Sequence, residues 1–132
     1  MQTTTKAILT LATLGIATFG HAEPTQEEYF ADPDNQARFE QLSDMGMMAK
    51  ARESMMQSCA TQTTIDCDCV KTKIDNVSDE TLYYESMMAY EAIQEITDAI
   101  QAGDNELAEK LKAEQQNRTS ELSDIEQSCM AH

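Results

Sequence analysis

Four cysteines constrain the fold of this chain more than any other feature, because covalent links fix which segments lie together. The chain of 132 residues contains Cys59, Cys67, Cys69 and Cys129. Four cysteines allow three pairings. A bond between Cys67 and Cys69 would enclose a single residue and would be strained. In both other pairings Cys59 joins one of these two residues and Cys129 joins the other, and the sequence leaves both arrangements open.

The first 22 residues have the pattern of a secretory signal peptide. Lys6 supplies a positive charge, an apolar run of 13 residues covers 7–19, and small residues stand at Gly20 and Ala22. The run is shorter than the roughly 20 residues that cross a bilayer. We therefore predict a signal peptide over 1–22, a single helical domain over 23–132, and a periplasmic or secreted location. Such an oxidising compartment favours two disulfides over free thiols.

The composition is strongly acidic. The chain has 24 Asp and Glu residues against nine Lys and Arg residues, for a net charge of −15, and cleavage after Ala22 would remove Lys6 and leave −16. Phosphate binding needs clustered Lys and Arg, so the charge argues against a nucleic acid as the partner. The acids are spread over the chain, which is typical of a solvated surface, and they favour a basic protein or peptide as a partner.

Residue types that carry out catalysis are sparse. After cleavage His132 is the one histidine, which argues against Ser–His and Cys–His nucleophile pairs and against histidine zinc sites. The sequence contains neither a glycine-rich phosphate loop nor a nucleophile elbow. We therefore predict that the protein is not an enzyme and holds no cofactor and no metal.

Hydrophobic periodicity predicts three long helices, because apolar residues recur every three or four positions. The first begins after Asp32 and ends at Cys59, the second runs from a Ser78 cap to about Ala102, and the third covers 105–129. The second helix has the most regular repeat, formed by Leu82, Ser86, Ala89, Ile93, Ile96 and Ile100.

Two short helical segments and one polar interruption complete this pattern. Thr25 and Glu28 fit a capping box that opens a short helical turn, and 70–75 is predicted to be a short helix. In the third long helix, Gln115 and Arg118 occupy expected core positions. We therefore expect the middle of the protein to be partly polar or open to a partner.

Three long helices with short connections predict the all-α class and a small up-down-up three-helix bundle. The first helix ends at Cys59, the second begins shortly after Cys67 and Cys69, and the third ends at Cys129. In an up-down-up order, these positions lie at the same end of the bundle. We therefore expect two disulfides clustered at one end, where they stabilise the fold by restricting the unfolded chain.

Methionine is unusually common, with eight residues after cleavage, most of them in three groups close in sequence. Methionine fills irregular gaps in small helical cores, and exposed methionines form adaptable binding surfaces. Thioether sulfur is also a soft ligand that suits Cu(I). The candidate binding surface consists of Met47, Met48, Met55, Met87 and Met88.

The sequence therefore favours a secreted, disulfide-stabilised acidic helical protein that acts as a non-catalytic binding or interaction module. A periplasmic Cu(I)-binding protein that uses the same methionines is the first alternative, although the scarcity of histidine weakens it. A thiol–disulfide redox protein centred on Cys67 and Cys69 is the second alternative. The acids Asp66 and Asp68 beside these cysteines disfavour the thiolate that redox chemistry needs.

Overall fold

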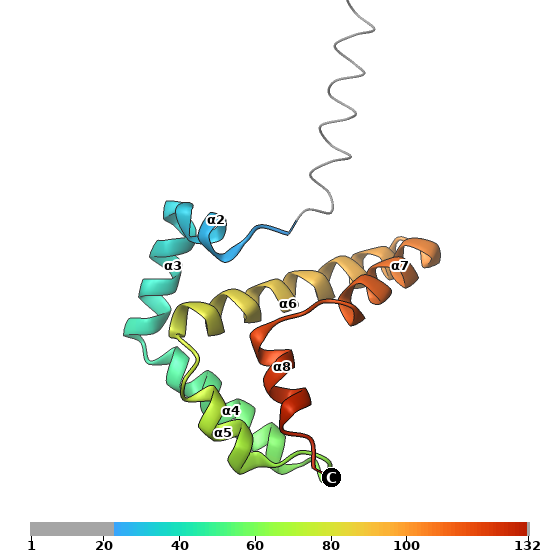
Figure 1. The fold of residues 1–132 in the computed structure, drawn as a ribbon. Coiled ribbons are helices and arrows are strands. Elements are labelled where there is room, and N and C mark those ends of the chain that lie inside the picture. The colour runs from blue at the N-terminus through green and yellow to red at the C-terminus, as the bar shows by residue number, and fades with distance from the viewer. Residues whose placement is uncertain (1–22, 132) are drawn as a thin grey trace, which may run out of the picture.

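The computed structural model describes residues 23–131, and the predicted signal peptide over 1–22 lies outside the described residues. The described chain is all-helical, as predicted, and a single antiparallel bridge joins Ile65 to Met130 (Figure 1). None of its helices is long and apolar enough to cross a membrane. The helices are α2 (Gln26–Ala31), α3 (Pro33–Asp44), α4 (Met47–Ala60), α5 (Cys67–Ile74), α6 (Asp79–Gln101), α7 (Asn105–Gln116) and α8 (Glu121–Ser128).

The up-down-up arrangement of three helices is not confirmed, because seven helices are counted in residues 23–131. The first predicted long helix is interrupted at Gly46, and the chain changes direction between α3 and α4 (Figure 1). Gly46 has a φ of 74°, in the left-handed region that glycine adopts without steric cost. The third predicted helix is likewise divided, into α7 and α8, by 117–120.

Local capping explains where most helices begin. The Ser78 side chain accepts a hydrogen bond from the backbone N–H of Thr81 at the start of α6, which confirms the predicted start of this helix. Asp66 caps α5, which begins at Cys67, three residues before the predicted start at 70. Ser120 and Ser123 form a reciprocal capping box at the start of α8, and this box fixes the interruption after α7.

The core consists of three small clusters. The disulfide cluster joins α4, α5 and α8 to the start of α6 and contains Cys59, Val70, Ile74, Val77, Leu82, Ile125 and Cys129. The aromatic cluster joins α2, α3 and the first turn of α4 to the first half of α6 and contains Tyr29, Phe39, Met48, Tyr83 and Met88. The third cluster lies between α6 and α7 and contains Ala99, Ala108 and Leu111.

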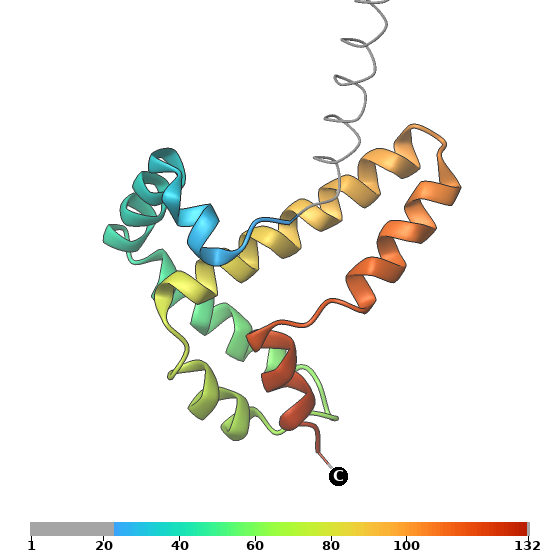
Figure 2. The same ribbon diagram turned by 45° about the horizontal axis from the view of Figure 1, so that its top comes forward.

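The helices α6 and α7 form an antiparallel hairpin that extends away from the two larger clusters (Figures 1 and 2). The contact between them rests on small apolar residues, with Ile96 and Leu107 packed beside the buried alanines. No other helix among the described residues covers the far part of this hairpin (Figure 2). A large share of the α6 surface is therefore free of contacts within the described chain.

Arg52 ties α4 to the segment between α5 and α6. Its guanidinium donates to Asp79 Oδ1 at 2.5 Å and to the backbone carbonyl of Val77 at 2.6 Å. The Arg52 side chain is only 20% exposed, so this ion pair is better shielded from water than a typical surface pair. Arg52 thus fixes the start of α6 relative to the disulfide cluster.

Candidate functional site

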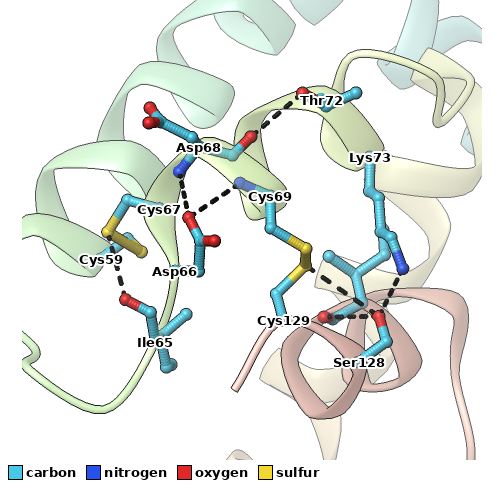
Figure 3. Close-up of a disulfide and its surroundings, with 11 residues drawn as sticks. Cys59, Ile65, Asp66, Cys67, Asp68, Cys69, Thr72, Lys73, Ser128 and Cys129 are labelled. Carbon is cyan, nitrogen blue, oxygen red and sulfur yellow. Dashed lines mark hydrogen bonds between the residues drawn. A yellow bond between two sulfur atoms is a disulfide. The ribbon is translucent and has the colours of Figure 1, made fainter. Parts of the chain in front are cut away.

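The two disulfides join Cys59 to Cys67 and Cys69 to Cys129, which is one of the two pairings that the sequence left open (Figure 3). The first bond links α4 to α5, and the second links α5 to the end of α8. The prediction of two disulfides is confirmed, and all four cysteines lie in or against one hydrophobic cluster.

Backbone and side-chain hydrogen bonds reinforce this end of the molecule. The N–H of Asp66 donates to the Cys129 carbonyl at 2.8 Å, and the N–H of Ala131 donates to the Thr64 carbonyl at 2.8 Å. Lys73 Nζ donates to Ser128 Oγ at 2.7 Å. The residues at the end of α8 and after it are therefore held to α5 by a disulfide and to the loop before α5 by hydrogen bonds.

The surroundings of Cys67 and Cys69 favour structural disulfides over redox chemistry. Cys67 and Cys69 occupy the first turn of α5, where free N–H groups would stabilise a thiolate. Asp66 Oδ1 instead accepts hydrogen bonds from Asp68 N and Cys69 N, at 3.1 Å and 3.2 Å (Figure 3). A carboxylate already fills the anion position, and its negative charge opposes a thiolate beside it.

The structure does not bring the five candidate methionines onto one exposed surface. Met48 and Met88 are 7% and 2% exposed and belong to the aromatic cluster, so their placement on a contact surface was wrong. Both face inward because they pack against aromatic rings, a contact that suits thioether sulfur. Met87 packs against the same cluster and is partly buried.

Met47 and Met55 remain accessible but lie in different surroundings. Met47 is 36% exposed in the first turn of α4, directly after Gly46. Met55 is partly buried, and it lines two separate hollows of the molecule. In residues 23–131 no group of three or more His, Cys, Asp or Glu side chains is arranged to hold a metal ion.

The larger of these two hollows, here called the groove, has a volume of about 480 Å³ and lies between α4, α6 and the segment that joins α7 to α8. Its walls are mainly apolar, and the charged side chains among them are Glu85 and Arg118. The lining residues are Met55, Glu85, Ser86, Ala89, Tyr90, Ile93, Gln115, Arg118, Ser120, Leu122 and Ser123.

An exposed stripe on α6 extends from the groove along the hairpin. We define this α6 stripe as Tyr90, Ile93, Thr97 and Ile100, which recur at spacings of three and four and therefore share one face. Tyr90, Ile93 and Ile100 are 57%, 56% and 50% exposed. The acids of the same segment, which are Glu91, Glu95 and Asp98, lie on the opposite face by the same periodicity.

Glu85 is a buried carboxylate that was not among the predicted site residues. It is 7% exposed, and its oxygens accept hydrogen bonds from the backbone N–H groups of Glu121 and Leu122, each at 3.1 Å. These groups open α8, so Glu85 holds the start of that helix against α6. Burial raises the pKa of Glu85, and the two backbone hydrogen bonds act in the opposite direction.

The other charged side chain of the groove is also paired within the chain. Arg118 Nη2 lies 3.3 Å from Glu23 Oε1, and the Arg118 side chain is 16% exposed. Tyr84 Oη donates to the backbone carbonyl of Pro24, next to Glu23. Gln115 lies in the last turn of α7 and Arg118 in the segment after it, and both line the groove, which explains why these expected core positions are polar.

No protein-family model, no curated protein and no solved structure matches this chain.

Proposed function

We propose that this protein is an extracytoplasmic, non-catalytic interaction module, periplasmic or secreted, that binds an amphipathic helix of a basic partner. The observation that carries the proposal is the apolar α6 stripe, which is exposed at Tyr90, Ile93 and Ile100 and leads into the groove. An amphipathic helix that lays its apolar face into such a groove is a common recognition mode.

The dimensions of the surface suit a short helix. Tyr90 and Ile100 are ten residues apart, which corresponds to about 15 Å along the helix axis. About three turns of a partner helix would cover this length. More of the residues that line the groove belong to α6 than to any other helix, and those from α4 and α8 lie on helices that the disulfides and Glu85 hold in place. Such a preformed surface loses little conformational entropy on binding.

The distribution of charge supports a basic partner. The contact stripe itself is uncharged, and Glu85 and Arg118 in the groove have partners within the chain. The net charge of −16 that remains after the predicted cleavage attracts cations from a distance and speeds association. The apolar face would then provide affinity, and the acidic surface would provide steering and selectivity.

A synthetic peptide tests the proposal directly. The probe is a labelled 18-residue helix with leucine on one face and lysine on the other, and fluorescence anisotropy measures its binding to the 23–132 chain. A peptide of the same composition with a scrambled order serves as the control for charge alone. We expect the amphipathic peptide to bind more tightly than the scrambled peptide, and raising the salt concentration to weaken both.

Two substitutions locate the binding surface. Ile93→Gln removes an apolar side chain from the stripe and is expected to weaken binding of the amphipathic peptide by about tenfold. Met130→Gln is the matched control, since Met130 is 50% exposed but lies near the carboxyl end. Equal binding of the two peptides, or equal loss in the two variants, would contradict the proposal.

A further inference from the structure

The second hollow of the molecule is an apolar cavity of about 230 Å³ in the disulfide cluster. Its walls come from α4, α5 and α8 and include Met55, Val70, Ile74 and Ile125. We call it the disulfide cavity. The groove and the disulfide cavity share Met55 and Leu122 as lining residues, so these two side chains separate them. Val70 and Ile74 line the disulfide cavity alone, and Ile93 lines the groove alone.

Covalent links hold the helices that line this cavity in a fixed arrangement. Cys59–Cys67 fixes α4 against α5, and Cys69–Cys129 fixes α5 against α8. Water inside such a cavity would meet mostly hydrocarbon and would find few hydrogen-bond partners. Displacement of poorly ordered water by an apolar group is favourable. The cavity is thus preformed for an apolar occupant, which is the usual state of a small-molecule site.

Polar side chains stand where the cavity meets the solvent. Ser58, Gln62 and Glu126 contribute to the lining, and all three residues are exposed. Among the described lining residues, Glu126 is the one that carries a charge. A carboxylate at the mouth and hydrocarbon inside are complementary to a molecule with an apolar body and a positively charged end.

We propose that the disulfide cavity binds a small hydrophobic amine, with an aromatic or branched alkyl group between the helices and its ammonium group beside Glu126. The volume supports a group of about the size of a benzene ring or somewhat larger, since an engineered apolar cavity of about 150 Å³ accommodates benzene. The site is distinct from the helix-binding groove, and its occupation does not depend on the function proposed above.

The probe for this proposal is 2-phenylethylamine, which is protonated at neutral pH. Methyl NMR spectra of the oxidised 23–132 chain would follow its titration, with 3-phenylpropanoate as an anion of similar size and shape. We expect saturable shifts of the Val70 and Ile74 methyl signals, no comparable shift at Ile93, and weaker binding of the anion. Shifts that do not saturate, or that are confined to Ile93, would overturn the proposal.

Two variants test the role of the carboxylate at the mouth of the cavity. Glu126→Gln, at an exposed position, is expected to weaken binding of the amine two- to fivefold. The variant is also expected to lose the preference for the amine over 3-phenylpropanoate. Asp124→Asn on the same helix is the matched control, because Asp124 is exposed and does not line the cavity. Equal affinities in the two variants would overturn the assignment of Glu126.

Filling the cavity provides a test that does not depend on charge. Val70→Phe places a ring where the apolar part of the ligand would lie, and it is expected to abolish the shifts of Ile74. The amide spectrum of the variant would show whether the chain is folded, and Val70→Leu is a smaller replacement for use if it is not. Undiminished binding by a folded, filled variant would overturn the proposal.

Discussion

The hydroxyl group of Tyr83 is buried and has no hydrogen-bond partner among the described residues. Tyr83 is 4% exposed in the aromatic cluster, where its ring lies 5.5 Å from that of Phe39. A buried polar group without a partner loses its hydrogen bonds to water on folding and forms none within the folded chain, which lowers the free energy of unfolding. We expect Tyr83→Phe to leave the free energy of unfolding unchanged or to raise it by up to about 1 kcal/mol, as measured by urea denaturation.

Tyr84→Phe is the matched control for this prediction. The Tyr84 hydroxyl donates to the carbonyl of Pro24, so its removal should lower the free energy of unfolding by about 1 kcal/mol. The two tyrosines are adjacent on α6, and each variant removes one oxygen atom. A larger loss for Tyr83→Phe than for Tyr84→Phe would contradict the proposed difference in their hydrogen bonding.

The raised pKa of Glu85 has a direct consequence for stability. Burial is the main cause of the shift, the Glu121 carboxylate adds to it, and the Arg118 guanidinium opposes it. The folded chain therefore takes up a proton at Glu85 at a higher pH than the unfolded chain does. Between the ordinary glutamate pKa and this raised value, the contribution of Glu85 to stability falls as the pH rises.

Glu85→Gln isolates this contribution, because glutamine keeps the shape of the side chain and cannot ionise. We expect the stability of the wild-type chain relative to Glu85→Gln to decrease as the pH rises from about 4.5 through the raised pKa. Urea denaturation of both chains at a series of pH values measures this difference. A difference that is constant, or that grows with pH, would contradict the raised pKa.

Glu85 was not predicted as a buried residue because an acid on a predicted helix is usually solvated. A signal was nevertheless present. Glu85 lies three residues after Leu82 and four residues before Ala89, so it occupies the apolar face of the second predicted helix. The hydrogen-bond partners of Glu85 could not be predicted from the sequence, because these N–H groups belong to a helix start 36 residues away.

At the scale of secondary-structure elements, helix starts were predicted more accurately than interruptions. Caps depend on one side chain and a few neighbouring N–H groups, so the start at Ser78 was readable from the sequence. The breaks at Gly46 and at 117–120 were not predicted, because the apolar positions follow the helical period on both sides of each break. Hydrophobic periodicity indicates which face of a helix is buried, but it does not indicate where the helix axis changes direction.

The conformation of Gly46 leads to a prediction about the joint between α3 and α4. With a φ of 74°, a side chain at this position would strain the backbone, although the space around it is open. Gly46→Ala is therefore expected to lower the free energy of unfolding by about 1 kcal/mol. Gly46→Asn should cost less, because asparagine tolerates the left-handed region better than alanine does. Equal stability of the wild type and Gly46→Ala would contradict this assignment.

At the scale of the whole molecule, the two disulfides and the all-helical class were predicted correctly, whereas the number of helices was not. The two disulfides were predicted from the number of cysteines and the predicted oxidising compartment, neither of which depends on the path of the helices. The division into three small clusters depends on breaks at Gly46 and after α7, which redirect the chain. These breaks also leave the α6 stripe uncovered and create the groove and the disulfide cavity.

The two disulfides enclose loops of very different length, which predicts unequal contributions to stability. Cys59 and Cys67 are eight residues apart, whereas Cys69 and Cys129 are 60 residues apart. The entropy that a cross-link removes from the unfolded chain grows with the logarithm of loop length. This relation gives about 2.5 kcal/mol for the short loop and about 4.3 kcal/mol for the long one.

Paired serine variants measure these contributions without leaving unpaired thiols. Cys69→Ser with Cys129→Ser is expected to destabilise the chain by about 2 kcal/mol more than Cys59→Ser with Cys67→Ser, as measured by urea denaturation. Both pairs remove two sulfur atoms from the same hydrophobic cluster, so the loss of buried apolar surface is similar and the difference reports chain entropy. A larger loss from the short-loop pair would show that local packing at α4 and α5, rather than closure of the long loop through α8, holds this end of the molecule together.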